Sequence, residues 1–114
     1  MAFGMPNRSA AAAALASVSQ TATTWTVEFQ NVPEFGSTIG RTFSVTLHAG
    51  GAIDLAYGTA AGNDGLVGVT PGGGAANPGE TDLSAAGALS ATGTTYELFG
   101  TAEFDLSNLT LLFN

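Results

Sequence analysis

Three consecutive runs of alternating apolar and polar residues constrain the fold of this chain more than any other feature of its sequence. Residues 24–32, 41–49 and 51–57 contain apolar series that begin at Trp25, Phe43 and Ile53 and recur at every second position. A period of two places all apolar side chains of a run on one face of a pleated strand. The three runs therefore predict half-buried antiparallel strands joined by turns.

Shorter apolar runs at residues 65–69, 95–99 and 109–113 predict three further strands. The glycine pair at residues 50–51 suits a hairpin turn, because glycine readily adopts positive φ. Residues 70–93 form a long loop rich in Gly, Pro and Ala, and loops of this length are typically functional or held by a partner. The last run is apolar on both faces, so we expect it in a central position or covered by another chain.

Residues 9–19 predict the only helix. Ser9 is a good N-cap and the alanine run that follows has high helix propensity, with Leu15 and Val18 facing the sheet. Residues 17–21 also alternate, so an extended conformation remains the alternative there. The predicted fold class is all-β: a small antiparallel β-sandwich of about six or seven strands, with one short N-terminal helix at most.

Charge and composition exclude several classes of function. The chain has 114 residues, enough for one domain, and a net charge of −7 with Arg8 and Arg41 as its only basic residues. Nucleic acid and anionic membrane surfaces are therefore unsuitable partners. No apolar run is long enough for membrane insertion as a helix. Charged residues make up only 10% of the chain, a composition typical of extracellular β domains and assembly subunits.

No catalytic constellation is evident, so we expect a non-enzymatic protein without a cofactor. His48 is the only histidine and alternates out of phase with its apolar neighbours, which predicts a solvent-facing side chain. No nucleophile elbow accompanies it, and a zinc site would need more His or Cys ligands. Loop carboxylates suit Ca²⁺, and the candidates are Asp64, Glu80 and Asp82, although Asn63-Asp64-Gly65 is also an ordinary turn.

The strand motifs resemble a known family. The Trp25 strand, which ends in Asn-Val, is followed by a Thr-Phe strand, a Tyr-Gly strand end and the run Gly-Leu-Val-Gly at residues 65–68. In this order the motifs are similar to the C-terminal half of the nidogen-like domain, as found in secreted bacterial surface proteins. The resemblance covers residues 23–114. Arg41 and the glycine pair at residues 50–51 depart from the family pattern, and residues 1–22 stand where the family has its N-terminal half.

The resemblance implies an extracellular or cell-surface module whose sheet edges are completed by neighbouring subunits. We expect residues 1–22 to be an Ala-rich, edge-covering assembly segment and residues 23–114 to be the nidogen-like domain. The expected function is self-assembly into a surface or filamentous structure, with other copies of the chain as partners. The residues expected at the interface are Leu15, Val18, Leu109, Leu111, Leu112 and Phe113.

A carbohydrate- or matrix-binding adhesion module is the alternative function. It would use an aromatic side chain on an exposed face to stack against a sugar, and the candidates are Trp25, Tyr57 and Tyr96. Trp25 leads an alternating strand, so it is also a natural core residue.

Overall fold

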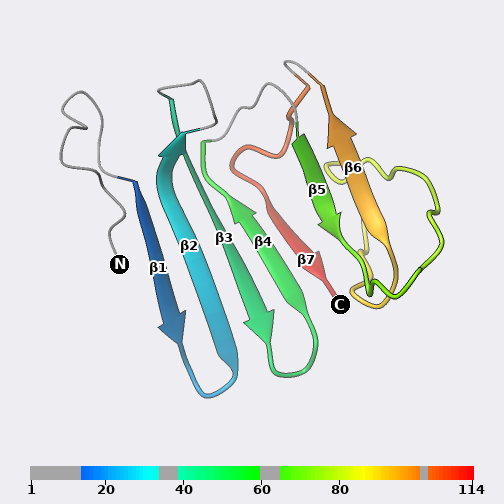
Figure 1. The fold of residues 1–114 in the computed structure, drawn as a ribbon, viewed down its shortest axis with the longest axis horizontal. Helices are drawn as coiled ribbons and strands as arrows, with labels where there is room; N and C mark the ends of the chain where they lie inside the picture. The colour runs from blue at the N-terminus through cyan, green and yellow to red at the C-terminus, as the bar shows by residue number, and fades with distance from the viewer. Residues whose placement is uncertain (1–13, 34–38, 60–64, 101–102) are drawn as a thin grey trace.

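The computed structural model describes residues 14–33, 39–59, 65–100 and 103–114, and these residues form an all-β structure without a helix (Figure 1). The seven strands are β1 (Leu15–Gln20), β2 (Thr24–Pro33), β3 (Gly40–His48), β4 (Ile53–Tyr57), β5 (Gly65–Val69), β6 (Thr95–Phe99) and β7 (Thr110–Phe113). The strands predicted from alternation are confirmed, with ends that shift by one or two residues.

The strands form two antiparallel sheets. The larger sheet has the order β1-β2-β3-β4-β7, and β5 pairs with β6 in a separate two-stranded sheet. The β5–β6 pair is therefore inserted in the chain between two neighbours of the larger sheet. Figure 1 shows this pair at the β7 end of the larger sheet, far from β1.

Turn chemistry sets the register of the first four strands. In the β3–β4 hairpin, Gly51 has a φ of 102°, and its N–H donates to the carbonyl of His48 over 2.9 Å. Only glycine adopts this φ without strain, which confirms the predicted turn. In the β1–β2 hairpin, Thr21 Oγ1 accepts a 3.0 Å hydrogen bond from the N–H of Thr24. Both turns keep apolar residues of successive strands on the same face of the sheet.

The core lies between the β4–β7 end of the larger sheet and the β5–β6 pair. Its buried members come from both sheets and from the connecting segments: Leu55, Leu83, Phe99, Leu106, Leu111 and Phe113. Leu83 and Leu106 belong to segments without regular structure, yet they are among the most deeply buried side chains. Loop residues therefore take the place of further strands in covering the sheet.

The predicted helix at residues 9–19 is wrong where the structure describes it. β1 pairs with β2 in antiparallel register, with Val18 opposite Val27 and Gln20 opposite Trp25. The alternation of residues 15–20 and the hydrogen-bonding edge of β2 outweigh the helix propensity of alanine, because a short helix is marginal without packing. Residues 9–13 lie outside the described residues. The extended alternative is the correct one.

The predicted central position of the last strand is also wrong. β7 is the outermost strand of its sheet and pairs only with β4. Its other side is met by the chain itself, because Asn114 N–H donates to the Leu89 carbonyl over 3.0 Å and Ala91 N–H donates to the Asn114 carbonyl over 2.9 Å. One of the two apolar faces of β7 is buried in the core, and the other exposes Leu112. A partly protected edge can therefore carry a strand that is apolar on both sides.

Candidate functional site

One face of the five-stranded sheet is apolar across its width but buried only at one end. The register aligns a row of five side chains that runs from Val18 through Val27, Val45 and Leu55 to Leu111. Along this row the exposed fraction falls from 61% at Val18 to 9% at Leu55 and 6% at Leu111. The β7 end of the face is core, and the β1 end is open to solvent.

The exposure follows from the small size of the second layer. The β5–β6 pair and its connecting segments pack over β4 and β7 and reach Val45 on β3, whereas no residue of β1 or β2 packs against the core among the described residues. Trp25 is 40% exposed and Leu47 is 42% exposed on this part of the sheet. We call this surface the open apolar face; it consists of exposed Val18, Trp25 and Leu47 and half-buried Val27, Phe29, Phe43 and Val45, none of them charged.

A row of aromatic rings connects the open apolar face with the core. Phe29 stacks on Phe43 with ring centroids 4.9 Å apart, and Phe43 stacks on Tyr57 at 6.1 Å. Tyr57 meets Phe104 edge to face at 5.4 Å, and Phe104 reaches Phe99 at 5.0 Å. Burial raises the pKa of the Tyr57 hydroxyl. Aromatic pairs of this geometry stabilise a fold beyond the effect of burial alone. The row of rings therefore stabilises the packing of the open apolar face next to the core.

The opposite face of the sheet is polar and holds the only histidine. His48 Nε2 lies 2.7 Å from Asp54 Oδ2, and the hydroxyls of Thr26 and Thr46 are 2.9 Å apart. As predicted, His48 projects away from the apolar series of its strand. Asp54, the acidic partner of His48, is partly exposed, and so is His48. The two side chains pair neighbouring strands on a solvated surface.

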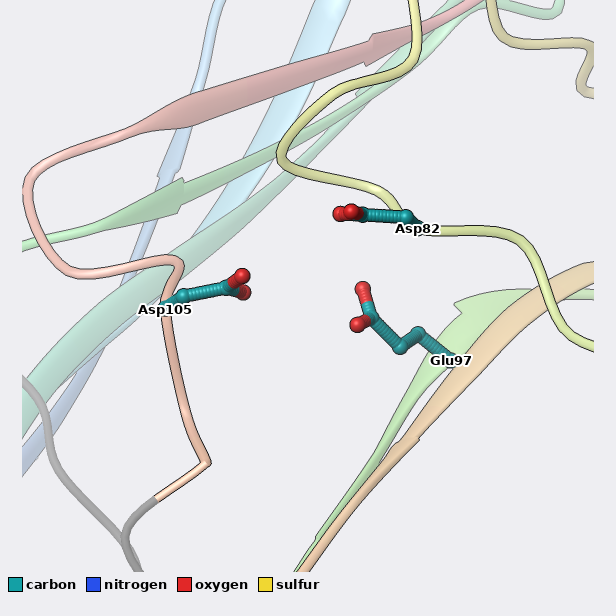
Figure 2. Close-up of side chains that lie close together, drawn as sticks. All are labelled: Asp82, Glu97 and Asp105. Carbon is teal, nitrogen blue, oxygen red and sulfur yellow. The ribbon is translucent and has the colours of Figure 1, made fainter.

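Three carboxylates from separate segments converge beside the core (Figure 2). Asp82 belongs to the long loop, Glu97 to β6 and Asp105 to the segment before β7, and one oxygen of each lies within 4.8 Å of the others. Glu97 Oε2 accepts from the N–H of Leu83 over 2.8 Å. Ser84 Oγ donates both to Asp82 Oδ1, over 2.7 Å, and to Asp105 Oδ2, over 3.0 Å. The cluster therefore fastens the segment that carries buried Leu83.

The cluster shifts the pKa values of two of its members in opposite directions. Hydrogen bonds, first from the Ser84 hydroxyl, lower the pKa of Asp82. Partial burial raises the pKa of Glu97, and the negative charges of Asp105 and Asp82 raise it further. A group whose pKa is raised by folding destabilises the folded state once the pH passes above the group's ordinary value. Glu97 therefore costs stability at neutral pH, whereas Asp82 contributes stability that is lost only in acid.

The Glu97→Gln variant tests this assignment. Glutamine keeps an oxygen that accepts from Leu83 N–H and removes the charge, so we expect higher stability than the wild type at neutral pH, by about 0.5 kcal/mol for a half-exposed group. The difference should shrink as the pH falls below the ordinary pKa of a glutamate. Urea unfolding at neutral and acidic pH measures it. The Glu97→Ala variant loses the acceptor as well, and equal stability of both variants would show that the Leu83 hydrogen bond contributes nothing.

The predicted calcium ligands are placed in different surroundings. Asp82 is in the carboxylate cluster, whereas Glu80 Oε1 accepts a 2.9 Å hydrogen bond from Leu98 N–H, and Asp64 lies outside the described residues. Ca²⁺ takes six to eight oxygens. In the cluster, one oxygen of each of the three carboxylates already accepts a hydrogen bond within the chain. Sequence reasoning missed Glu97 and Asp105. The available signal was that Glu97 shares the phase of Phe99, an acid on the apolar side of its strand.

A shallow groove of about 530 Å³ lies over the outer face of the β5–β6 pair. Tyr96 lies against Gly68, where an added Cβ would be only 2.6 Å from Tyr96 Cβ. The Tyr96 hydroxyl donates to Asn77 Oδ1 over 2.8 Å, and exposed Leu66 and Leu98 complete the walls. Of the three aromatic candidates for sugar stacking, Tyr96 is therefore the one in a groove, Trp25 is on the open apolar face, and Tyr57 packs among aromatic rings.

The six residues expected at an interface fall into four groups. Val18 belongs to the open apolar face, and Leu15 lies on the opposite face of the same strand. Leu109 and Leu112 are exposed near the β7 edge, whereas Leu111 and Phe113 are buried in the core of the chain itself. Sequence reasoning did not select Trp25 and Leu47 for an interface. The alternation of their strands assigns both residues to one face of the sheet, but it does not show that the second layer ends before it covers them.

No protein-family model matches this sequence, and neither a curated protein nor a solved structure matches it. The resemblance to the nidogen-like domain therefore stays a prediction. Among the described residues, no helix has the length and apolar character needed to cross a membrane.

Proposed function

We propose that this protein is a non-enzymatic structural module of the cell surface that assembles with copies of itself. The observation that carries the proposal is the open apolar face, where large apolar side chains such as Trp25 and Leu47 remain exposed on a well-paired sheet. Contiguous exposed apolar patches of this kind mark interaction surfaces in folded proteins. The low charge content and the resemblance to nidogen-like surface domains favour an extracellular location.

A second copy is the partner that fits this surface best. Two sheets stack face to face when both present apolar side chains, at a separation of about 10 Å. In the proposed dimer, the open apolar face of one subunit covers that of the other across a two-fold axis, so each three-stranded region gains the second layer that its own chain lacks. The sandwich predicted from the sequence is then completed between subunits rather than within one.

The distribution of charge permits this pairing despite the net charge of −7. Glu28 and Asp54 project from the opposite face of the sheet, as their register shows. The carboxylate cluster of Asp82, Glu97 and Asp105 lies beyond β7, where the second layer covers the core. Stacking two open apolar faces brings none of these acids together. Repulsion among these five acids therefore opposes association only weakly at physiological ionic strength.

The mass of the purified wild-type protein in solution tests the proposal. We expect dimers or larger species by size-exclusion chromatography with multi-angle light scattering, in a concentration-dependent equilibrium with monomer. Negative-stain microscopy of the same sample distinguishes closed dimers from extended assemblies. A monodisperse monomer over the whole dilution series, up to the solubility limit, would contradict self-assembly.

A carbohydrate- or matrix-binding module is the second candidate, and the Tyr96 groove favours it. The ring lies beside the side-chain amide of Asn77 and the linked hydroxyls of Thr70 and Thr94, which are 2.9 Å apart. Sugars are bound by such combinations of an aromatic face and neutral polar groups. The groove walls are mostly apolar, so this candidate has weaker support. A glycan-binding module needs no self-association, which is why a purely monomeric mass would favour it.

A further inference from the structure

Residues 77–81 of the long loop cover the outer edge of β6, and we call them the strap. Figure 1 shows β6 at the end of the molecule away from β1, with the long loop on its outer side. Leu98 N–H donates to Glu80 Oε1 over 2.9 Å, and Thr81 N–H donates to the Tyr96 carbonyl over 2.8 Å. Both hydrogen bonds occupy backbone groups that point away from β5, where a further strand would pair. The strap therefore protects this edge against the addition of another chain.

The strap lies on the surface, whereas the residue that follows it closely is anchored in the core. Residues 77–80 are exposed. Gly79 has a φ of 91°, a backbone conformation that glycine adopts without strain. Leu83 is 2% exposed and packs in the core between the two sheets. Residues 77–81 can therefore move away from β6 while Leu83 stays in place.

Four carboxylates surround the attachment of the strap. Glu80 belongs to the strap and Asp82 follows it, while Glu97 on β6 and Asp105 before β7 face them. On β5 the register partner of Glu97 is uncharged Val67. Partial burial raises the pKa of Glu97, and the three neighbouring negative charges raise it further. The closed arrangement is therefore most stable below the ordinary pKa of a glutamate and loses stability as the pH rises through the raised value.

We propose that the strap is an autoinhibitory cover of the β6 edge and that the charge of Glu97 controls its closure. With Glu97 protonated, the strap stays closed and assembly is confined to the open apolar face. With Glu97 charged, repulsion from Glu80 and Asp82 increases the population of the open form. The Tyr96 carbonyl and the Leu98 N–H then become available to a strand of a second copy. This inference rests on the proposed self-assembly and concerns its regulation.

Hydrogen exchange at the Leu98 amide, followed by NMR, measures opening of the strap, because Glu80 accepts from this N–H. The Glu80→Ala variant removes the acceptor and should speed the exchange on the order of tenfold. The Glu80→Gln variant keeps an acceptor oxygen and should stay protected. The Phe99 amide points towards β5 by the alternation of the strand, so its exchange should not change. Unchanged exchange at Leu98 in Glu80→Ala would overturn the strap.

The Glu97→Gln variant tests the dependence on charge. At neutral pH its Leu98 amide should exchange about twofold more slowly than that of the wild type, an effect typical of a partly exposed charge. Below the ordinary pKa of a glutamate the two proteins should agree. Comparing both proteins at each pH cancels the intrinsic pH dependence of exchange. A ratio that is the same at neutral and acidic pH would overturn control by the charge of Glu97.

The double variant Glu80→Ala, Thr81→Pro tests the consequence for assembly. It removes both hydrogen bonds between the strap and β6, so light scattering at neutral pH should show larger species than for the wild type at the same concentration. A wild-type mass, in a double variant whose Leu98 amide exchanges fast, would overturn autoinhibition and leave self-assembly through the open apolar face standing. A wild-type protein and a double variant that both stay monomeric would overturn self-assembly and its regulation together.

Discussion

The Phe113→Ala variant is expected to lose about 3–5 kcal/mol of unfolding free energy, a large part of the total for a domain of this size. Phe113 is completely buried, and its strand is held to β4 by pairing with Ile53. Removing the ring leaves a cavity where the larger sheet meets Leu83 and Leu106, and the surrounding loops are fixed by hydrogen bonds that limit relaxation. Chemical denaturation followed by circular dichroism measures the loss.

The matched control is Leu112→Ala on the same strand. Leu112 is exposed on the other face and lies opposite Asp54, so its truncation should change stability by less than about 0.5 kcal/mol. Similar losses for both variants would show that β7 is held by its backbone pairing rather than by the ring of Phe113. The core assigned to the β4–β7 end of the sheet would then be incorrect.

The Val18→Lys variant is expected to weaken self-association at least on the order of a hundredfold while the monomer remains folded. Val18 is exposed in the subunit, so a charge there should alter monomer stability little. In the proposed dimer, two-fold symmetry buries the new ammonium group twice in an uncharged surface, where the desolvation of an unpaired charge costs several kcal/mol. Light scattering over a dilution series gives the change in dissociation constant.

Ser17→Lys is the control for this variant. Ser17 neighbours Val18 on β1 and projects from the opposite, polar face, where it lies opposite Glu28. The Ser17→Lys variant adds the same charge to the same strand as Val18→Lys. Any effect of lysine on the net charge or on the edge of β1 is therefore common to both variants. Equal association of the two lysine variants would contradict an interface on the open apolar face.

The strands of the larger sheet were predictable because their signal is local. Trp25, Val27 and Phe29 alternate with polar residues, and the glycine at position 51 marks the turn after β3. The first strand was predicted only as the alternative to a helix, because a run of alanine has helix propensity and the hydrogen-bonding edge of β2 that overrides it is a tertiary feature. The edge position of β7 was missed for a related reason. Its cover comes from residues 89–91, which are distant in the sequence.

The candidate sites were less predictable than the strands. The carboxylate cluster unites Asp82, Glu97 and Asp105 from three segments, and no spacing in the sequence brings them together. The open apolar face depends on where the second layer ends, because the same alternation produces buried Leu55 and exposed Leu47 on adjacent strands. Periodicity assigns a residue to a face of a sheet. It does not say how far along that face the rest of the chain extends.

The insertion of β5 and β6 between β4 and β7 has a consequence for the kinetics of folding. The pairings of β1 through β4 are hairpins between neighbours in the chain, whereas β7 must find β4 across more than fifty residues, from Tyr57 to Thr110. Local pairings form faster because less chain entropy is lost in closing them. The four-stranded meander should therefore precede the rest, with its whole apolar face bare for a time. During that interval, encounter with another chain competes with closure by β7, so the yield of refolding should fall as the protein concentration rises.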